Sequence, residues 1–313
     1  MAPRARRLLS GALLAAFAAT LTLAVAVQVV WLRASTFRDE EAIDARSARY
    51  SDREALRLLF VGDSFTAGSL SESDLGWWAY VPAALRERGV SRRVEVLSVA
   101  VAGSPTPFHR RQVRDWLDES GQVADFLVFV TGANNPNSVE LWTEYVLGPT
   151  GARHTTRSER ALYGAPSGFR LFALSVGRRL GRDLPPDPRR RDVPALDMYL
   201  SRHPEYHAWI EERTTAEFVG LASLARERGM RPIAASYLTD PLVPATRAGA
   251  SAADVPFFDI ASEARQTRWG GMGLLSPDGW HLSDAGNKRY AALWVEWFLA
   301  GPGALSVPSA AAE

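Results

Sequence analysis

The chain has 313 residues, 47% of them hydrophobic and 23% charged, so it is long enough to bury a sizeable core in one or two globular domains. Its formal net charge of +1 gives no general attraction to nucleic acid or other acidic polymers. Cysteine is absent, which excludes disulfides, thiol catalysis and a lipid-modified cysteine.

The N-terminal segment, residues 1–33, has the pattern of a membrane anchor. Arginines among the first seven residues are followed by a stretch, residues 8–32, that has no charged side chain and is long enough to cross a bilayer as a helix. The basic flank should stay in the cytoplasm, which places the rest of the chain on the outer side. A cleaved signal peptide is the alternative, because Ala24-Val25-Ala26 resembles a cleavage site. We favour the anchor because the apolar run continues beyond that site.

The composition of the rest of the chain indicates three segments. Residues 34–54 are dense in charge and are interpreted as a tether, residues 55–301 as one globular domain, and residues 302–313 as a disordered tail. A long stretch at about 136–207 is interpreted as an insertion into that domain. It contains a predicted helix, 158–181, and a basic, proline-rich loop whose arginines are interpreted as solvated, with binding of an anionic partner as the alternative.

Short apolar runs alternate with amphipathic stretches from residue 56 onward. Strands are predicted at 56–62, 92–103, 125–135, 231–238 and 255–260. Helices are predicted at 77–89, 109–121, 216–230 and 282–301, the last with Ser283 as its N-cap. Continuous apolar strands separated by helices predict an α/β fold, a parallel sheet covered on both faces and joined by right-handed crossovers.

Small and polar residues follow each of the first three predicted strands. They are Gly62-Asp63-Ser64, then Gly103-Ser104, then residues 132–135. Because functional groups gather at the carboxyl ends of parallel strands, these residues are predicted to share one edge of the sheet.

Ser64 is the candidate nucleophile, although a serine at a strand-to-helix corner is by itself weak evidence. A serine hydroxyl needs a base to take its proton and a third group to orient that base. Asp278 precedes His281 by three residues in a polar loop, and this spacing lets the carboxylate reach Nδ1 of the imidazole. Nε2 would then face Ser64. The candidate donors to an oxyanion are the backbone N–H groups of Ser64 and Gly103 and the side-chain amide of Asn134.

Four segments in this order, "GDSFTAG", "VLSVAVAGSP", "TGANN" and "DGWHLSDAGNKRYA", resemble the conserved blocks of the SGNH (GDSL-like) hydrolase family. The resemblance implies a flavodoxin-like α/β/α sandwich that needs no metal or cofactor. It matches the family's Ser, Gly, Asn and His to Ser64, Gly103, Asn134 and His281, with Asp278 as the acid. The third block departs from the family, because Asn135 stands where a supportive carboxylate is usual.

Several neighbouring residues receive structural interpretations. Asp63 and Thr66 are expected to stabilise the corner around Ser64, and Trp280 to line the site. Asp240 and Asp259, at strand ends, are expected to stabilise loops. The other histidines lack acidic or cysteine neighbours at convincing metal-ligand spacing; they are His109, His154, His203 and His207.

The leading hypothesis is a membrane-anchored, extracytoplasmic serine esterase that uses Ser64, His281 and Asp278. Its expected substrates are esters of short acyl groups, O-acetyl groups on glycans included, and no nucleic-acid partner is expected. One alternative is an O-acyltransferase acting on an envelope or exported polysaccharide, because a sugar hydroxyl could replace water in the same mechanism. The other is a non-catalytic envelope scaffold that keeps the fold.

Overall fold

The computed structural model describes residues 48–302 except 53, 137, 166–175, 177–203, 239–242 and 261–268, together with residues 22, 25, 26 and 176. The predicted anchor apart from residues 22, 25 and 26, most of the predicted tether, the basic loop and the tail beyond residue 302 lie outside the described residues. Among the residues described, no helix combines the length and the apolar character needed to cross a bilayer. The chain divides into two compact units.

The larger unit is built on a five-stranded parallel sheet. Its strands are β1 (Leu56–Gly62), β2 (Val94–Ser98), β3 (Phe126–Val130), β4 (Arg231–Ala235) and β5 (Phe257–Phe258). They lie in the order β2-β1-β3-β4-β5, and every neighbouring pair is parallel. The predicted α/β fold with a parallel sheet is therefore confirmed, and the strand order is the flavodoxin-like one.

The predicted second strand, 92–103, is too long. β2 ends at Ser98, and the chain continues along the edge of β1 as a loop in which the N–H groups of Val99 and Val101 donate to Phe60 and Gly62, at 2.8 and 3.0 Å. Val99 and Val101 are buried, so an apolar pattern extends past the strand into the loop at the end of the sheet. β3, β4 and β5 are likewise shorter than predicted.

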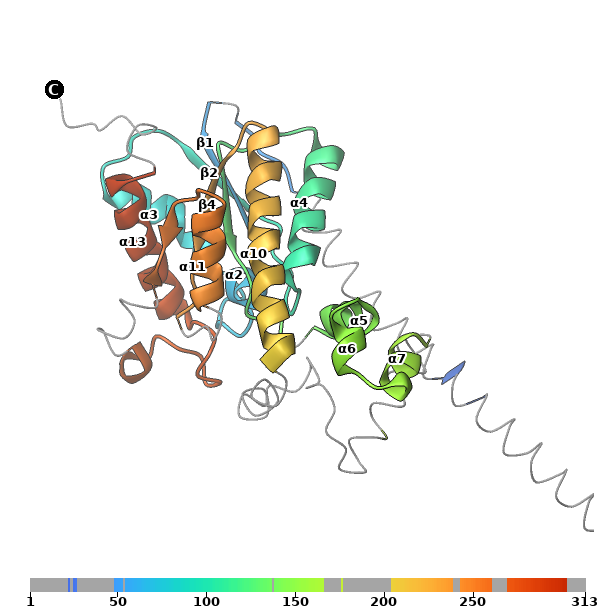
Figure 1. Cartoon of the computed structure of the whole chain (residues 1–313). Coiled ribbons are helices and arrows are strands. Elements are labelled where there is room, and N and C mark those ends of the chain that lie inside the picture. Colours follow the sequence, from blue (N-terminus) through green and yellow to red (C-terminus); the bar gives the residue numbers. More distant parts are fainter. Residues whose placement is uncertain are drawn as a thin grey trace, which may run out of the picture. The chain divides into compact units, whose positions relative to one another are not determined.

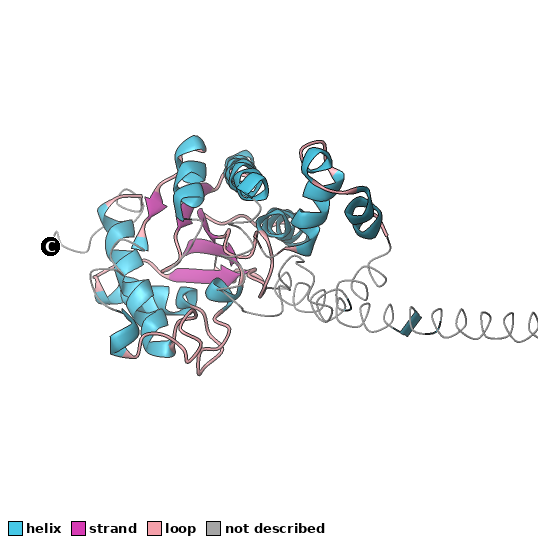
Figure 2. Cartoon of the chain, turned by 60° about the horizontal axis from the view of Figure 1, so that its bottom comes forward, coloured by secondary structure: helices cyan, strands magenta, loops and turns pink. Residues whose placement is uncertain are grey.

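Helices cover both faces of the sheet (Figures 1 and 2). The 3-10 helix η1 (Trp77–Tyr80), α3 (Val81–Glu87) and α13 (Asp284–Ala300) share one hydrophobic cluster with one face. α4 (Thr106–Ser120), α10 (Pro204–Glu227) and α11 (Val243–Ala252) share a second cluster with the other. This arrangement is the predicted α/β/α sandwich. Ser283 caps α13 as predicted, because its hydroxyl accepts from the N–H of Gly286 at 3.1 Å.

Two helices of this unit differ from the prediction. α10 begins twelve residues before the predicted start, and the buried Tyr206, Ile210, Thr214 and Phe218 recur every fourth residue along it, as one face of a helix does. α11 was not predicted, because small and polar residues dominate its sequence.

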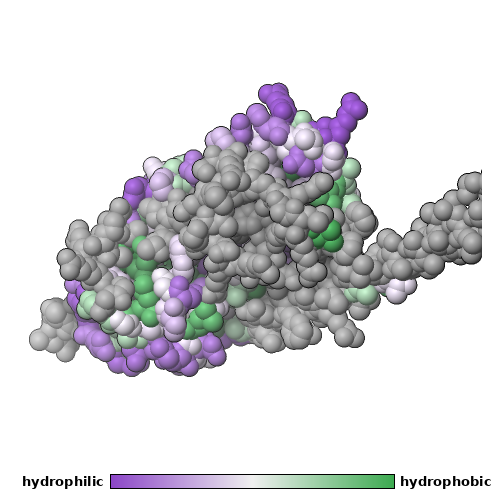
Figure 3. Space-filling view, turned by 90° about the horizontal axis from the view of Figure 1, so that it is seen from below, coloured by the Kyte–Doolittle hydropathy of each residue, from purple (hydrophilic) through white to green (hydrophobic). Residues whose placement is uncertain are grey.

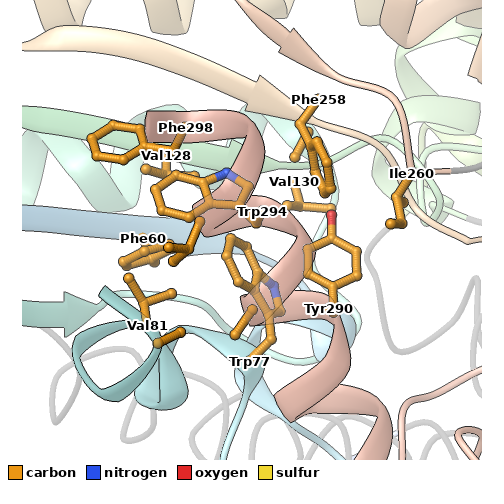
Figure 4. Packing of buried hydrophobic residues seen from close by; sticks show 14 of the residues in the cluster. Phe60, Trp77, Val81, Val128, Val130, Phe258, Ile260, Tyr290, Trp294 and Phe298 are labelled. Atoms are coloured by element: carbon orange, nitrogen blue, oxygen red, sulfur yellow. The ribbon is translucent and has the colours of Figure 1, made fainter. Parts of the chain in front are cut away.

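The core on the α13 side is aromatic (Figure 4). Phe60 of β1 meets the Trp77 ring edge-on at 5.0 Å, and Trp77 lies 4.8 Å from the ring of Tyr290. Trp294 stacks on Phe298 at 4.8 Å. Successive side chains of β1 point to opposite faces of the sheet, so Phe60 packs in this core while its neighbours Leu59 and Val61 pack in the other cluster.

The smaller unit contains α5 (Val139–Leu147), α6 (Gly151–His154) and α7 (Arg157–Tyr163). α7 begins with a capping box formed by Thr156 and Glu159. Trp142 of α5 packs against Tyr163 of α7, with the two ring centroids 6.1 Å apart. The predicted helix 158–181 is wrong in its extent, because α7 ends at Tyr163 and Gly164 forms its C-cap.

Candidate active site

Ser64 is the first residue of α2 (Ser64–Ala67), a single helical turn that follows β1 directly. α2 lies at the lower end of the strands in Figure 1, at the carboxyl edge of the sheet. Asp63 is the N-cap, and its carboxylate accepts from the N–H of Phe65 at 3.0 Å. Gly68, with φ of 82°, ends the turn. The corner therefore holds the Ser64 hydroxyl at the sheet edge, partly exposed.

The corner is packed so tightly that Gly62 has no room for a side chain. A Cβ on Gly62 would lie 2.4 Å from Oγ1 of Thr66 and 2.5 Å from the carbonyl oxygen of Val130. Thr66 is completely buried against this glycine. Asp63 and Thr66 thus stabilise the corner, as their positions in the sequence predicted.

A second loop presents Asp278 and His281. The N–H of Ser276 donates to the carbonyl of His281 at 2.8 Å, and the N–H of Gly279 donates back to the carbonyl of Ser276 at 2.9 Å, which closes a tight turn. Gly279 permits the turn with φ of 72°. Oδ1 of Asp278 accepts from the backbone N–H groups of Trp280 and His281, each at 3.0 Å.

The two loops bring the three predicted residues into one hydrogen-bonded chain. Oδ2 of Asp278 lies 2.6 Å from Nδ1 of His281, and Nε2 of His281 lies 2.8 Å from Oγ of Ser64. An ionised carboxylate only accepts hydrogen bonds, so the proton of the neutral ring is on Nδ1, and the Nε2 lone pair faces the serine hydroxyl.

Asp278 is suited to stay ionised in this arrangement. Its partial burial favours the neutral acid, but the hydrogen bonds from the N–H groups of Trp280 and His281 and from the His281 ring outweigh that effect. Together they hold the pKa of Asp278 below its ordinary value.

Exposed apolar side chains lie on the loops around Ser64 and His281. Leu70 follows α2, and its carbonyl accepts from the Ser276 hydroxyl at 2.9 Å, which joins the two loops. Leu70 and Trp280 are 51% and 36% exposed, and Met272, at the end of the 3-10 helix η2 (Trp269–Met272) that precedes the second loop, is 63% exposed. In the view from below, patches of hydrophobic surface lie beside hydrophilic surface at this end of the molecule (Figure 3).

Asp63 also connects Ser64 to the loop after β3. Its Oδ2 accepts from Nδ2 of Asn134 at 2.8 Å and from the hydroxyl of Tyr237 at 2.5 Å. Burial raises the pKa of Asp63 to about 6, and the hydrogen bonds from Tyr237, Phe65 and Asn134 offset only part of that effect. Tyr237, just beyond β4, is a site residue that the sequence reasoning missed.

Three hydrogen-bond donors near Ser64 have no acceptor among the residues described. They are the backbone N–H of Ser64, the backbone N–H of Gly103 and the second N–H of the Asn134 amide, whose first goes to Asp63. Gly103 has φ of 69° in the turn after Val101, which the Val101 N–H ties to Gly62.

The other residues considered from the sequence lie elsewhere or have other partners. Asp259 pairs with Arg247, while Asp240 and His203 lie outside the described residues. Within the part of the chain that is described, no three His, Asp or Glu side chains form a group that could hold a metal. His109 is completely buried and takes part in a polar network that the sequence reasoning also missed.

Comparison with protein-family models gives the class of the protein. Residues 60–289 match the GDSL-like lipase/acylhydrolase family. The match spans more than half of the chain and includes Ser64, Gly103, Asn134, Asp278 and His281. The chain therefore belongs to this family of carboxylic ester hydrolases.

Solved structures with a similar fold include a lipase/acylhydrolase from Enterococcus faecalis, with 16% identity over 82% of this chain and 99% of that one and a TM-score of 0.46. An acetyl xylan esterase from Geobacillus stearothermophilus has 16% identity over 77% of this chain and 93% of its own, with a TM-score of 0.43. No curated protein sequence matches the chain.

Proposed function

We propose that the protein is an extracytoplasmic serine esterase in which Ser64 is the nucleophile, His281 the general base and Asp278 the residue that orients it. The observation that carries the proposal is the continuous chain from Asp278 Oδ2 through both nitrogens of His281 to the Ser64 hydroxyl, with distances of 2.6 and 2.8 Å. A hydroxyl whose proton can pass directly to an oriented imidazole is an activated nucleophile.

The reaction follows from these positions. Oγ of Ser64 attacks the ester carbonyl while its proton passes to Nε2 of His281, and Asp278 stabilises the imidazolium that forms. The tetrahedral intermediate collapses when the imidazolium returns that proton to the departing alcohol. Water then attacks the acyl-enzyme in the same way, with His281 accepting one of its protons. The carboxylic acid leaves, and Ser64 regains its hydroxyl proton.

The oxyanion of each tetrahedral intermediate needs donors. The N–H groups of Ser64 and Gly103 and the second N–H of Asn134 are suited to this role, because they have no acceptor among the described residues. One well-placed donor of this kind is worth about 10²- to 10³-fold in rate.

The proposed substrates are esters of short acyl groups, including O-acetyl groups on glycans. Trp280 supports a sugar-bearing substrate, because it precedes His281 directly and its exposed ring is the kind of surface on which a ligand can pack. The apolar, uncharged run at residues 8–32 behind a basic N-terminus supports a membrane-anchored enzyme with its site outside the cytoplasm.

Alanine variants of the purified protein test the function. Ser64→Ala or His281→Ala should lower kcat for p-nitrophenyl acetate by about 10³-fold or more, because each removes a member of a unit that acts together. The melting temperature should stay close to that of the wild type. Ser69→Ala, in the same segment as Ser64, is the matched control and should keep its activity. Wild-type turnover in Ser64→Ala would remove the proposal.

A further inference from the structure

A chain of buried polar side chains runs beneath the loops that follow β2 and β3. Ser104 Oγ lies 2.6 Å from Nε2 of His109, and Nδ1 of His109 lies 2.5 Å from Oγ1 of Thr131. Thr131 donates to Thr106 at 2.9 Å. Thr106 donates in turn to Oδ1 of Asn135 at 3.0 Å. All five side chains are at most 4% exposed.

The directions of these hydrogen bonds determine the state of the His109 ring. The backbone N–H of Thr106 donates to Oδ1 of Asn135 at 2.9 Å, which identifies that atom as the oxygen. The Thr106 hydroxyl therefore donates to Asn135 and accepts from Thr131. Thr131 has then used its single proton, so it accepts from Nδ1–H of His109. Burial lowers the pKa of His109 to about 3, so the ring is neutral and Nε2 accepts.

Both ends of the chain lie beside the donors proposed for the oxyanion. Ser104 follows Gly103 directly. Its single hydroxyl proton is shared between Nε2 of His109, 2.6 Å away, and the carbonyl of Val101, 2.5 Å away, and these contacts close the turn around Gly103. Asn135 follows Asn134 directly, and its Nδ2 donates to Thr214 of α10 at 2.8 Å. The imidazole of His109 joins Ser104 to Thr131, and Thr106 forms a second connection between the two loops through Asn135.

We propose that His109 is a positioning residue for the oxyanion donors: its neutral imidazole bridges Ser104 and Thr131, and thereby sets the Gly103 turn relative to the loop that bears Asn134. This inference rests on the proposed function, because a fixed separation between these donors matters only if an oxyanion forms between them. The role is indirect, since the described contacts of His109 are to Ser104 and Thr131.

The burial of the ring argues against its being an interchangeable packing residue. A buried hydroxyl or imidazole without a partner costs about 1–3 kcal/mol, so a polar chain is tolerated only when its members are joined. Apolar side chains would fill the same space without that requirement. The neighbouring turn of the same helix shows this alternative, because Val113 of α4 is completely buried in the apolar cluster.

The experiment compares three variants of the full chain. His109→Phe fills the space but removes both hydrogen bonds, while His109→Gln keeps an amide that can bond to Ser104. Val113→Ala, one turn along α4, is the matched control that loses stability without touching the polar chain. For each protein we would measure kcat and KM for p-nitrophenyl acetate, the inhibition constant of phenylboronic acid and the melting temperature.

His109→Phe should lower kcat by about 10- to 100-fold, because a small misplacement of catalytic groups costs that much. KM should change little, because the substrate carbonyl makes its strongest hydrogen bonds only in the tetrahedral state. The inhibition constant of phenylboronic acid, which forms a tetrahedral adduct, should rise in proportion to the loss of kcat. His109→Gln should recover much of kcat, and Val113→Ala should lower only the melting temperature.

The inference would be overturned if His109→Phe and Val113→Ala lost the same stability and His109→Phe had no lower kcat than Val113→Ala. It would also be overturned if the inhibition constant of phenylboronic acid were the same for His109→Phe and the wild type. Failure of this inference can be distinguished from failure of the proposed function, because wild-type turnover in Ser64→Ala would remove the proposed function itself. If Ser64→Ala is inactive while His109→Phe keeps its kcat, only the role of His109 is wrong.

Discussion

At the scale of single residues, the carboxylate of Asp278 determines which nitrogen of His281 faces Ser64. It accepts from Nδ1 and from two backbone N–H groups at the same time. An asparagine could satisfy the backbone groups with its oxygen, but its NH₂ would then meet Nδ1. The ring would have to move its proton to Nε2, and the lone pair needed to accept the serine proton would be lost.

Asp278→Asn should therefore lower kcat by about 10³- to 10⁴-fold while KM and the melting temperature change little. Steady-state kinetics with p-nitrophenyl acetate and a thermal melt measure this. Asp254→Asn, at an exposed carboxylate, is the control and should match the wild type. Equal kcat in Asp278→Asn and the control would mean that Asp278 does not orient the base.

Asp63 should make stability depend on pH in a characteristic direction. Its pKa rises from 3.8 to about 6 on folding, so the native state holds the proton more tightly than the unfolded state does. Stability from this residue is therefore fully present below about pH 4 and is lost as the pH rises through 6, by about 3 kcal/mol in all.

Asp63→Asn has no ionisation at this position, so its stability should fall less than that of the wild type between pH 4 and 7. Urea unfolding of both proteins across this range gives the difference in the free energy of unfolding. Parallel pH profiles for the two proteins would show that Asp63 does not titrate near 6.

At the scale of elements, the corner between β1 and α2 depends on Gly62. A Cβ there would collide with Val130 O, a backbone atom that cannot rotate away, as well as with Thr66. Gly62→Ala should cost about 3 kcal/mol or more of stability, because the strand or the helical turn must shift.

The same substitution should also lower kcat, because the shift moves Ser64. Urea unfolding and steady-state kinetics measure the two effects. Gly89→Ala is the control: it also replaces a glycine, with φ of 82° but open space around it, and should cost only about 1–2 kcal/mol with activity unchanged. Equal stability losses in the two variants would show that the corner is less crowded than described.

Much of the element order could be predicted from the sequence. Continuous apolar runs identify buried strands well, so β1 has the predicted bounds and β3 begins one residue after the predicted start. β3 ends at Val130 instead of residue 135, where the apolar run gives way to small and polar residues. The pattern overestimated the length of β2, because Val99 and Val101 are buried in a loop that follows the strand. It missed α11, since its small and polar residues carry little helical periodicity.

The contact between Asp278 and His281 could be predicted, because it depends on a local motif. Asp278 and His281 are three residues apart, and the turn between them could be predicted from sequence alone. The contacts of Tyr237 with Asp63 and of His109 with Thr131 could not be predicted, because the partners are 174 and 22 residues apart in sequence. The one feature of the sequence that pointed to this polar network was the polar residue His109 on an apolar face of its helix.

At the scale of the whole molecule, the proposed location depends on residues 1–33. If this segment is an uncleaved anchor, the chain expressed in a bacterial host should sediment with membranes and be released by detergent. Its intact mass should include residues 1–33. A protein in the soluble extracytoplasmic fraction that begins after Ala26 would instead show a cleaved signal peptide.

The central claim is that the Ser64 hydroxyl is an activated nucleophile, and a fluorophosphonate probe tests it most directly. The wild-type protein should form one covalent adduct, which peptide mass spectrometry should assign to Ser64. His281→Ala should react far more slowly, because among the described residues His281 is the base within hydrogen-bond distance of the hydroxyl. An unlabelled wild type, or an adduct on a residue other than Ser64, would contradict the account.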